Sequence, residues 1–230
     1  MNHQFRCVMS LLLLLFWSLP EARPDDRRQH LLREVTLDRV EQWLPFHPDS
    51  ALRVLKQLEG EEGYQKLVPR LKFMQGEAFR WKREDAGALR LYRQVLEFRG
   101  TSIVFRAEVQ NAMGKVFWQS NIPDSTLLML HAAVVSASKG VSPEVLSRTA
   151  NDLGDWFMES NKLDSAIRYF LVALGQVRKT GDQAREAFIM NNIGLALYRM
   201  GDLDKSVQWQ LDALRLKELL GDGKSLCGSL

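Results

Sequence analysis

Apolar residues recur at intervals of three and four positions along the chain from about Leu31 onward, and strand-like alternation is nearly absent. This spacing is typical of amphipathic helices. The pattern is interrupted at short polar, glycine or proline stretches: Pro45–Asp49, Gly60–Gly63, Gly100, Asn121–Asp124, Gly140–Pro143, Asn161, Gly181, Asp182, Gly201, Asp202 and Gly221. The segments between these breaks are long enough for roughly four to five turns of helix. The sequence therefore predicts an all-α chain of successive antiparallel helices.

Several breaks also carry helix-start signals. Ser142 stands before Pro143, an arrangement that suits an N-cap residue followed by proline in the first turn. Asp124, Asp164 and Asp204 each precede an apolar helical run, and we expect them to cap it.

The helical segments repeat one another. Gly114, Gly154 and Gly194 are 40 residues apart, and Gly76 begins an earlier copy 38 residues upstream of Gly114. A small residue follows each glycine after twelve positions, and three of the four copies have alanine after nineteen. The residues that define this register are Gly76, Ala88, Tyr92, Gly114, Ala133, Gly154, Ala166, Phe170, Ala173, Gly194 and Ala213. A weaker copy comes first, with Ala51, Leu55 and Leu58 in its second helix.

These residues resemble the tetratricopeptide repeat (TPR), a helix-turn-helix unit with glycine early in helix A and alanines in helix B. The family unit has about 34 residues and HEAT or armadillo units about 40 to 47, so the period alone would favour another family. The small-residue pattern favours TPR, with both helices lengthened by about one turn. The alternative is a generic helical bundle, in which this register would not persist.

The resemblance implies a right-handed α-solenoid of antiparallel helix pairs. We assign residues 38–230 to an array of about five repeats, the first one degenerate. Residues 223–230 match the first turns of another helix A, and the next repeat glycine is expected at position 234. We therefore expect a truncated helix at this end, as in a piece of a longer array.

The N-terminal segment has a different pattern. Val8–Leu19 is apolar apart from two serines, and Pro20 and the polar stretch Glu21–Gln29 follow it. A membrane-spanning helix needs about 20 apolar residues, so this run is short for a span. Its length is typical of the apolar core of a secretory signal peptide; the alternative is a buried N-terminal helix. We expect residues 1–22 to be a signal peptide, residues 23–37 a linker or the start of the first helix, and the protein to be exported, periplasmic or otherwise extracytoplasmic.

Composition and motifs argue against an enzyme. The 31 basic and 28 acidic residues give a net charge of +3, too small to demand nucleic acid or anionic lipid as a partner. Two cysteines and four histidines do not suggest a disulfide framework or a rich metal site. The chain has no HExxH, CxxC, GxSxG, phosphate-loop or dinucleotide-binding motif. We therefore assign no catalytic, cofactor-binding or metal-binding residues.

The stretch Arg70–Arg99 is the most basic part of the chain, and Phe73, Phe79, Trp81 and Tyr92 are interleaved with its charges. This pattern fits either a nucleic-acid surface or a solvated helix face with aromatic side chains in the core. We favour the second interpretation, because an exported chain seldom meets nucleic acid. An anionic peptide is a third possible partner.

Asparagines give the most specific candidate for binding. Asn111, Asn151 and Asn191 each stand three residues before the repeat glycine. Helix A lines the concave groove in TPR proteins, and an amide offers both a donor and an acceptor to an extended peptide backbone. Some TPR proteins carry such an asparagine one position later, where this chain has Ala112, Asp152 and Asn192. The alternative role is hydrogen bonding between neighbouring repeats. The candidate groove residues are Asn111, Lys115, Trp118, Asn151, Asp155, Met158, Asn191, Asn192 and Tyr198.

The resemblance implies a non-catalytic scaffold that binds a protein or peptide segment in its groove. The alternative is the extracytoplasmic sensory input region of a larger histidine kinase or helix-turn-helix transcription regulator. That alternative implies a downstream membrane span and output domain, whereas the scaffold needs neither. An intrinsic enzyme ranks third.

Overall fold

The computed structural model describes residues 36–221. The predicted signal peptide, nearly all of the predicted linker and the predicted truncated helix at 223–230 lie outside these residues. The chain divides into two compact units, residues 1–42 and 43–230. In the first unit the described residues, 36–42, are helical.

The second unit consists of helices and turns over its described residues, which confirms the all-α prediction. Its elements in chain order are α3 (Pro48–Glu59), the 3₁₀ helix η1 (Glu62–Leu67), α4 (Val68–Trp81), α5 (Asp85–Glu97), α6 (Ile103–Gln119), α7 (Pro123–Lys139), α8 (Pro143–Glu159), α9 (Leu163–Thr180), α10 (Gln183–Met200) and α11 (Leu203–Leu219).

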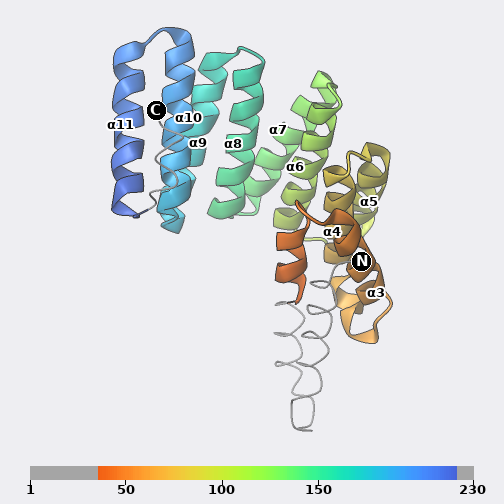
Figure 1. Cartoon of the computed structure of the whole chain (residues 1–230). Coiled ribbons are helices and arrows are strands. Elements are labelled where there is room, and N and C mark those ends of the chain that lie inside the picture. Colours follow the sequence, from red (N-terminus) through yellow and green to blue (C-terminus); the bar gives the residue numbers. More distant parts are fainter. Residues whose placement is uncertain (1–35, 222–230) are drawn as a thin grey trace. The chain divides into compact units, whose positions relative to one another are not determined.

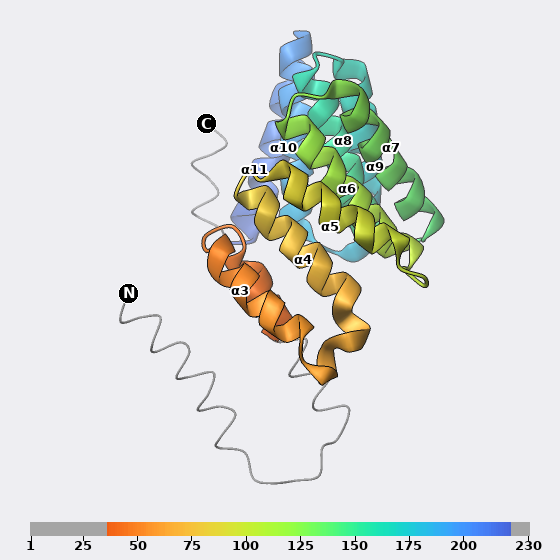
Figure 2. The same ribbon diagram turned by 90° about the vertical axis from the view of Figure 1, so that its right-hand side faces the viewer.

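Helices α4–α11 form four antiparallel pairs, α4/α5, α6/α7, α8/α9 and α10/α11, each packed against the next (Figures 1 and 2). We call the first member of each pair its A helix and the second its B helix. The A helices also contact one another directly, α4 with α6, α6 with α8 and α8 with α10. This arrangement is the expected α-solenoid.

The repeat glycines allow close approach of helices A and B, as the sequence pattern predicts. A β-carbon on each glycine would lie 2.5 to 2.8 Å from the side chain sixteen residues later: Gly76–Tyr92, Gly114–Leu130, Gly154–Phe170 and Gly194–Gln210. The small residues at the two B-helix positions are at most 2% exposed: Ala88, Thr126, Ala133, Ala166, Ala173, Ser206 and Ala213. The register derived from the sequence is therefore the packing register.

The helix starts confirm one capping prediction and contradict three. The Ser142 hydroxyl accepts a hydrogen bond from the Val145 amide, as expected of an N-cap. Asp124, Asp164 and Asp204 lie in the first turns of α7, α9 and α11, not at the N-cap. A carboxylate in the first turn still interacts favourably with the helix dipole. The aspartates therefore mark the helix starts, but each lies two residues after the N-cap.

The turn between α7 and α8 shows a role for glycine that the sequence pattern does not specify. Gly140 has an ordinary helical φ of −76°, and the left-handed residue is Val141, with φ of 52°. A β-carbon on Gly140 would lie 2.6 Å from a methyl group of Val104 on α6. Gly140 is therefore needed for close packing and not for its backbone conformation.

Candidate functional site

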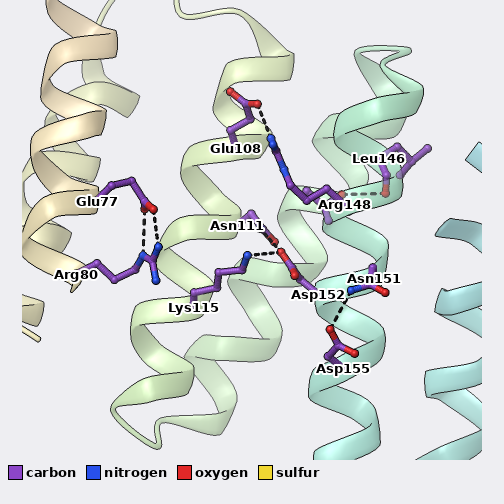
Figure 3. A network of polar contacts seen from close by, with 11 residues as sticks. Glu77, Arg80, Glu108, Asn111, Lys115, Leu146, Arg148, Asn151, Asp152 and Asp155 are labelled. Atoms are coloured by element: carbon purple, nitrogen blue, oxygen red, sulfur yellow. Dashed lines mark hydrogen bonds and ion pairs between the residues drawn. The ribbon is translucent and has the colours of Figure 1, made fainter. Parts of the chain in front are cut away.

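Polar side chains link successive A helices along the solenoid (Figure 3). Several of these links join residues 41 positions apart, one more than the repeat period: Asn111 Nδ2 to Asp152 Oδ2 (2.6 Å), Trp118 Nε1 to Glu159 Oε2 (2.8 Å), Asn192 Nδ2 to Asn151 Oδ1 (3.1 Å) and Arg199 to the Met158 carbonyl (2.9 Å). The recurrence of one spacing shows that α6, α8 and α10 are held in the same mutual register.

Two aspartates of α8 lie at the centre of these contacts. Asp152 accepts a hydrogen bond from Asn111 and forms an ion pair with Lys115. Both partners are on α6, and both N–O distances are 2.6 Å. Asp155 accepts hydrogen bonds from the amides of Asn151 (2.9 Å) and, across to α10, Asn192 (3.3 Å). Asp152 is therefore charge-neutralised, whereas the donors to Asp155 are uncharged.

The surroundings of Asp155 favour its protonated form. Burial is the largest cause and the negative charge of Asp152 the second, and together they raise its pKa to about 7. The hydrogen bond from Asn151 and the charge of Lys115 act in the opposite direction and do not compensate. Asp155 is thus a carboxyl group that titrates near neutral pH on the A-helix side of the array.

Two further ion pairs lie on the A helices (Figure 3). Arg148 of α8 pairs with Glu108 of α6, and so links the same two helices as Lys115 and Asp152. On α4, Glu77 pairs with Arg80 and accepts a hydrogen bond from the buried Tyr92 hydroxyl. Burial and the Glu77 carboxylate raise the pKa of Tyr92 well above its ordinary value. The charged groups in these pairs already bond to one another, so they have few free hydrogen-bonding positions for a ligand.

The predicted asparagine row does not face solvent as a set. Asn111 and Asn151 are 5% and 8% exposed, and both bond to residues of α8 or α10. Of the two roles considered for these asparagines, hydrogen bonding within and between repeats is the one that the amides of Asn111 and Asn151 have. Asn191 is half-buried, and no side-chain hydrogen bond is seen for it among the described residues.

The other candidate groove residues fall into two groups. Asn192 is buried, and Lys115, Trp118, Asp155 and Met158 are half-buried with contacts to a neighbouring A helix. Tyr198, in contrast, is 59% exposed on α10. The candidate residues thus lie on the A helices, and the polar groups of several of them already bond to a neighbouring A helix.

Residues outside the candidate set contribute to the same side. Asp152 and Glu159 are the acceptors for Asn111 and Trp118, and Phe188 and Leu195 are exposed apolar residues of α10. Asp152 and Glu159 each stand 41 residues after their donor. A repeat alignment compares positions 40 residues apart and therefore does not pair these donors with their acceptors.

The aromatic residues of the basic stretch 70–99 mostly belong to the core. Tyr92 is fully buried, and Phe73 and Phe79 pack against the same apolar cluster. Trp81 is 45% exposed, with the Arg80 guanidinium 4.9 Å from its ring centre. This distribution fits a solvated helix face with core aromatics.

Within residues 36–221 no group of three or more histidine, cysteine, aspartate or glutamate side chains could hold a metal ion. No helix in that range is both long enough and apolar enough to cross a membrane.

Comparison with known proteins supports the repeat assignment. Residues 145–218 match the family described as tetratricopeptide repeat. No curated protein matches the chain.

Solved structures share the fold at low sequence identity. BtubC (BKLC) from P. vanneervenii superposes with a TM-score of 0.67 at 17% identity, over 84% of this chain and 80% of that one. Aspartyl phosphate phosphatase F from Bacillus subtilis gives 0.66 at 16% identity, over 97% of this chain and 64% of that one. A Rap protein complexed with competence and sporulation factor gives 0.61 at 13% identity, with coverage of 98% and 64%. The chain therefore spans just under two thirds of the length of the last two proteins.

Proposed function

We propose that this chain, whose residues 145–218 match the tetratricopeptide-repeat family, is a non-catalytic scaffold that binds a peptide or protein segment along the A-helix side of its array. The similar Rap protein was solved in complex with competence and sporulation factor, which supports a protein or peptide as the partner. The array supplies an extended surface built from successive repeats, which is the feature that such folds use for binding.

One observation carries the proposal. Phe188, Leu195 and Tyr198 are 52%, 39% and 59% exposed on α10. Their spacings of seven and three residues place them on one face of that helix. A row of large apolar side chains on one helix face is typical of an interaction surface.

A random-peptide display against the full chain tests the proposal. We expect peptides to be enriched that bind the parent protein and lose at least tenfold in affinity when Leu195→Ser is introduced. Leu171→Ser is the matched control, because Leu171 has a similar exposure of 47% but lies on the B helix α9. If no peptide is enriched, or if both variants bind equally, the binding role is withdrawn.

The second candidate is the sensory input region of a histidine kinase or helix-turn-helix regulator. The apolar run Val8–Leu19 ahead of a repeat array favours it, because such receptors place their sensing part outside the cytoplasm. Sequencing the gene beyond codon 230 distinguishes the two. A run of about 20 apolar residues followed by an output domain would support the sensor, and a stop codon after a polar helix would support the free scaffold.

A further inference from the structure

The carboxyl group of Asp155 forms no ion pair in the part of the chain that the structure describes. Its hydrogen bonds come from the uncharged amides of Asn151 and Asn192, and no ion pair to it occurs within residues 36–221. The nearby Lys115 ammonium pairs with Asp152 at 2.6 Å. A half-buried carboxylate without a cation is costly, which agrees with the rise of its pKa to about 7.

The side-chain carbonyl oxygen of the nearby Asn111 is also without a hydrogen-bond donor among the described residues. Asn111 is 5% exposed and donates its Nδ2 to Asp152, but its Oδ1 is buried and has no hydrogen-bond partner in the described part of the chain. The cluster of Asn111, Lys115, Asp152 and Asp155 therefore holds two carboxylates and an unpaired carbonyl oxygen against a single ammonium group (Figure 3). Such a cluster gains from an added donor that carries positive charge.

An apolar surface borders this cluster. Asn192, which bonds to Asp155, precedes Leu195 by three positions on α10 and follows Phe188 by four. These spacings place Leu195 and Phe188 on the face of α10 that carries Asn192, and Tyr198 lies one turn beyond Leu195, on the side of Leu195 away from Asn192. An exposed apolar row and an uncompensated carboxyl group are thus neighbours on adjacent A helices.

We infer that this surface binds an extended peptide in which a lysine or arginine side chain stands beside apolar or aromatic residues. The cation would pair with Asp155, and the apolar residues would cover Phe188, Leu195 and Tyr198. An acidic peptide would meet Asp152, Asp155 and Glu159 and be repelled. This inference rests on the proposed peptide-binding function and names the chemistry of the peptide.

The peptide display on the full chain separates the two claims. Enriched sequences should carry a lysine or arginine within two positions of a leucine, phenylalanine or similar residue. Enrichment of peptides without a basic residue would overturn the inference but leave peptide binding in place. A display without any enrichment would overturn both.

Binding of a synthetic copy of the enriched peptide then tests Asp155 directly. We expect Asp155→Asn to weaken binding at least tenfold and Asp164→Asn, the same change on the exposed first turn of α9, to leave it unchanged. Replacing the basic residue of the peptide by norleucine should weaken binding to the parent as much, and should add nothing with Asp155→Asn. Equal binding of the norleucine peptide to the parent would refute the pairing, and that measurement needs no variant protein.

The pH dependence gives an independent readout. The charged groups near Asp155 are Asp152 and Glu159 of its own helix and Lys115 of α6. From α10 come the neutral Asn192 and, one turn further along α8, Arg199, whose guanidinium donates to the Met158 carbonyl. Because a cation binds only the ionised carboxylate, affinity for the basic peptide should fall severalfold from pH 8 to pH 5.5 in the parent. The same affinity should be flat with Asp155→Asn, and a parallel fall in both proteins would contradict the inference.

Discussion

At the scale of single residues, glycine has two distinct roles in this chain. In helix A the repeat glycine is required by the neighbouring helix, since a β-carbon on Gly154 would lie 2.6 Å from the ring of Phe170. Gly175 lies within α9, and apart from the nearby backbone of its own helix a β-carbon there would meet open space. The same substitution should therefore have opposite effects at the two positions.

We expect Gly154→Ala to lower the free energy of unfolding by about 1–3 kcal/mol, because the added methyl group would overlap the ring of Phe170, which is fully buried. Gly175→Ala should raise it by roughly 0.5–1 kcal/mol, because alanine loses less backbone entropy than glycine in a helix. Urea denaturation of both variants measures the two effects. Changes of the same sign would mean that the assigned packing of α8 on α9 is incorrect.

The elevated pKa of Asp155 makes a second prediction at this scale. Its folded-state pKa is about 7, above the ordinary carboxyl value of roughly 3.9. The native state therefore holds the proton more tightly than the unfolded state, so the contribution to stability is fully present below about pH 4 and is lost as the pH rises to 7.

We expect Asp155→Asn to remove this component. The loss of stability between pH 5 and pH 8 should be smaller in the variant than in the parent by about 1–2 kcal/mol, a figure reduced for the partial exposure of the carboxyl group. Asp164→Asn, on an exposed turn, should follow the parent curve. Chemical denaturation at several pH values measures the difference, and parallel curves for the parent and Asp155→Asn would show that Asp155 does not titrate in this range.

At the scale of helices, the contacts between A helices determine which asparagines are structural. Asn111 and Asn151 each link α8 to a neighbouring A helix. Asn191 occupies the same repeat position on α10, but its side chain shows no hydrogen bond within residues 36–221. Equivalent sequence positions thus have different energetic roles.

Alanine substitution of the three asparagines separates these roles. Asn111→Ala and Asn151→Ala should each cost about 1–3 kcal/mol, because each removes a hydrogen bond to a half-buried carboxylate. Asn191→Ala should change stability by less than about 0.5 kcal/mol. Thermal or urea denaturation of the three variants measures these changes in stability. A large loss with Asn191→Ala, or none with the other two, would contradict the assigned contacts.

At the scale of the whole molecule, export is a prediction about residues that the structure does not describe. The apolar run Val8–Leu19 predicts that the mature protein begins near Arg23 and lies outside the cytoplasm. N-terminal sequencing of the protein recovered from its host, with fractionation of the cells, measures both points. An intact Met1 in a cytoplasmic fraction would refute export, and the repeat array would be unaffected.

The sequence by itself determined the helices, their pairing and their register. Helix length and order follow from apolar spacing, which is a local property, and the glycine and alanine columns encode close approach because only small residues fit there. The packing of Gly154 and Ala173 against their neighbours therefore follows from the repeat pattern alone.

Tertiary structure decided what the polar residues do. Nothing local marks Asp152 as the acceptor for Asn111, because the two residues meet only when α8 lies beside α6 at an offset of 41 positions. The raised pKa of Asp155 likewise depends on burial between packed helices, which outweighs the opposing charge of Lys115 from α6. Apolar packing follows from the kind of residue at each position, whereas hydrogen bonds and ionisation depend on which individual atoms meet, and only the folded chain determines that.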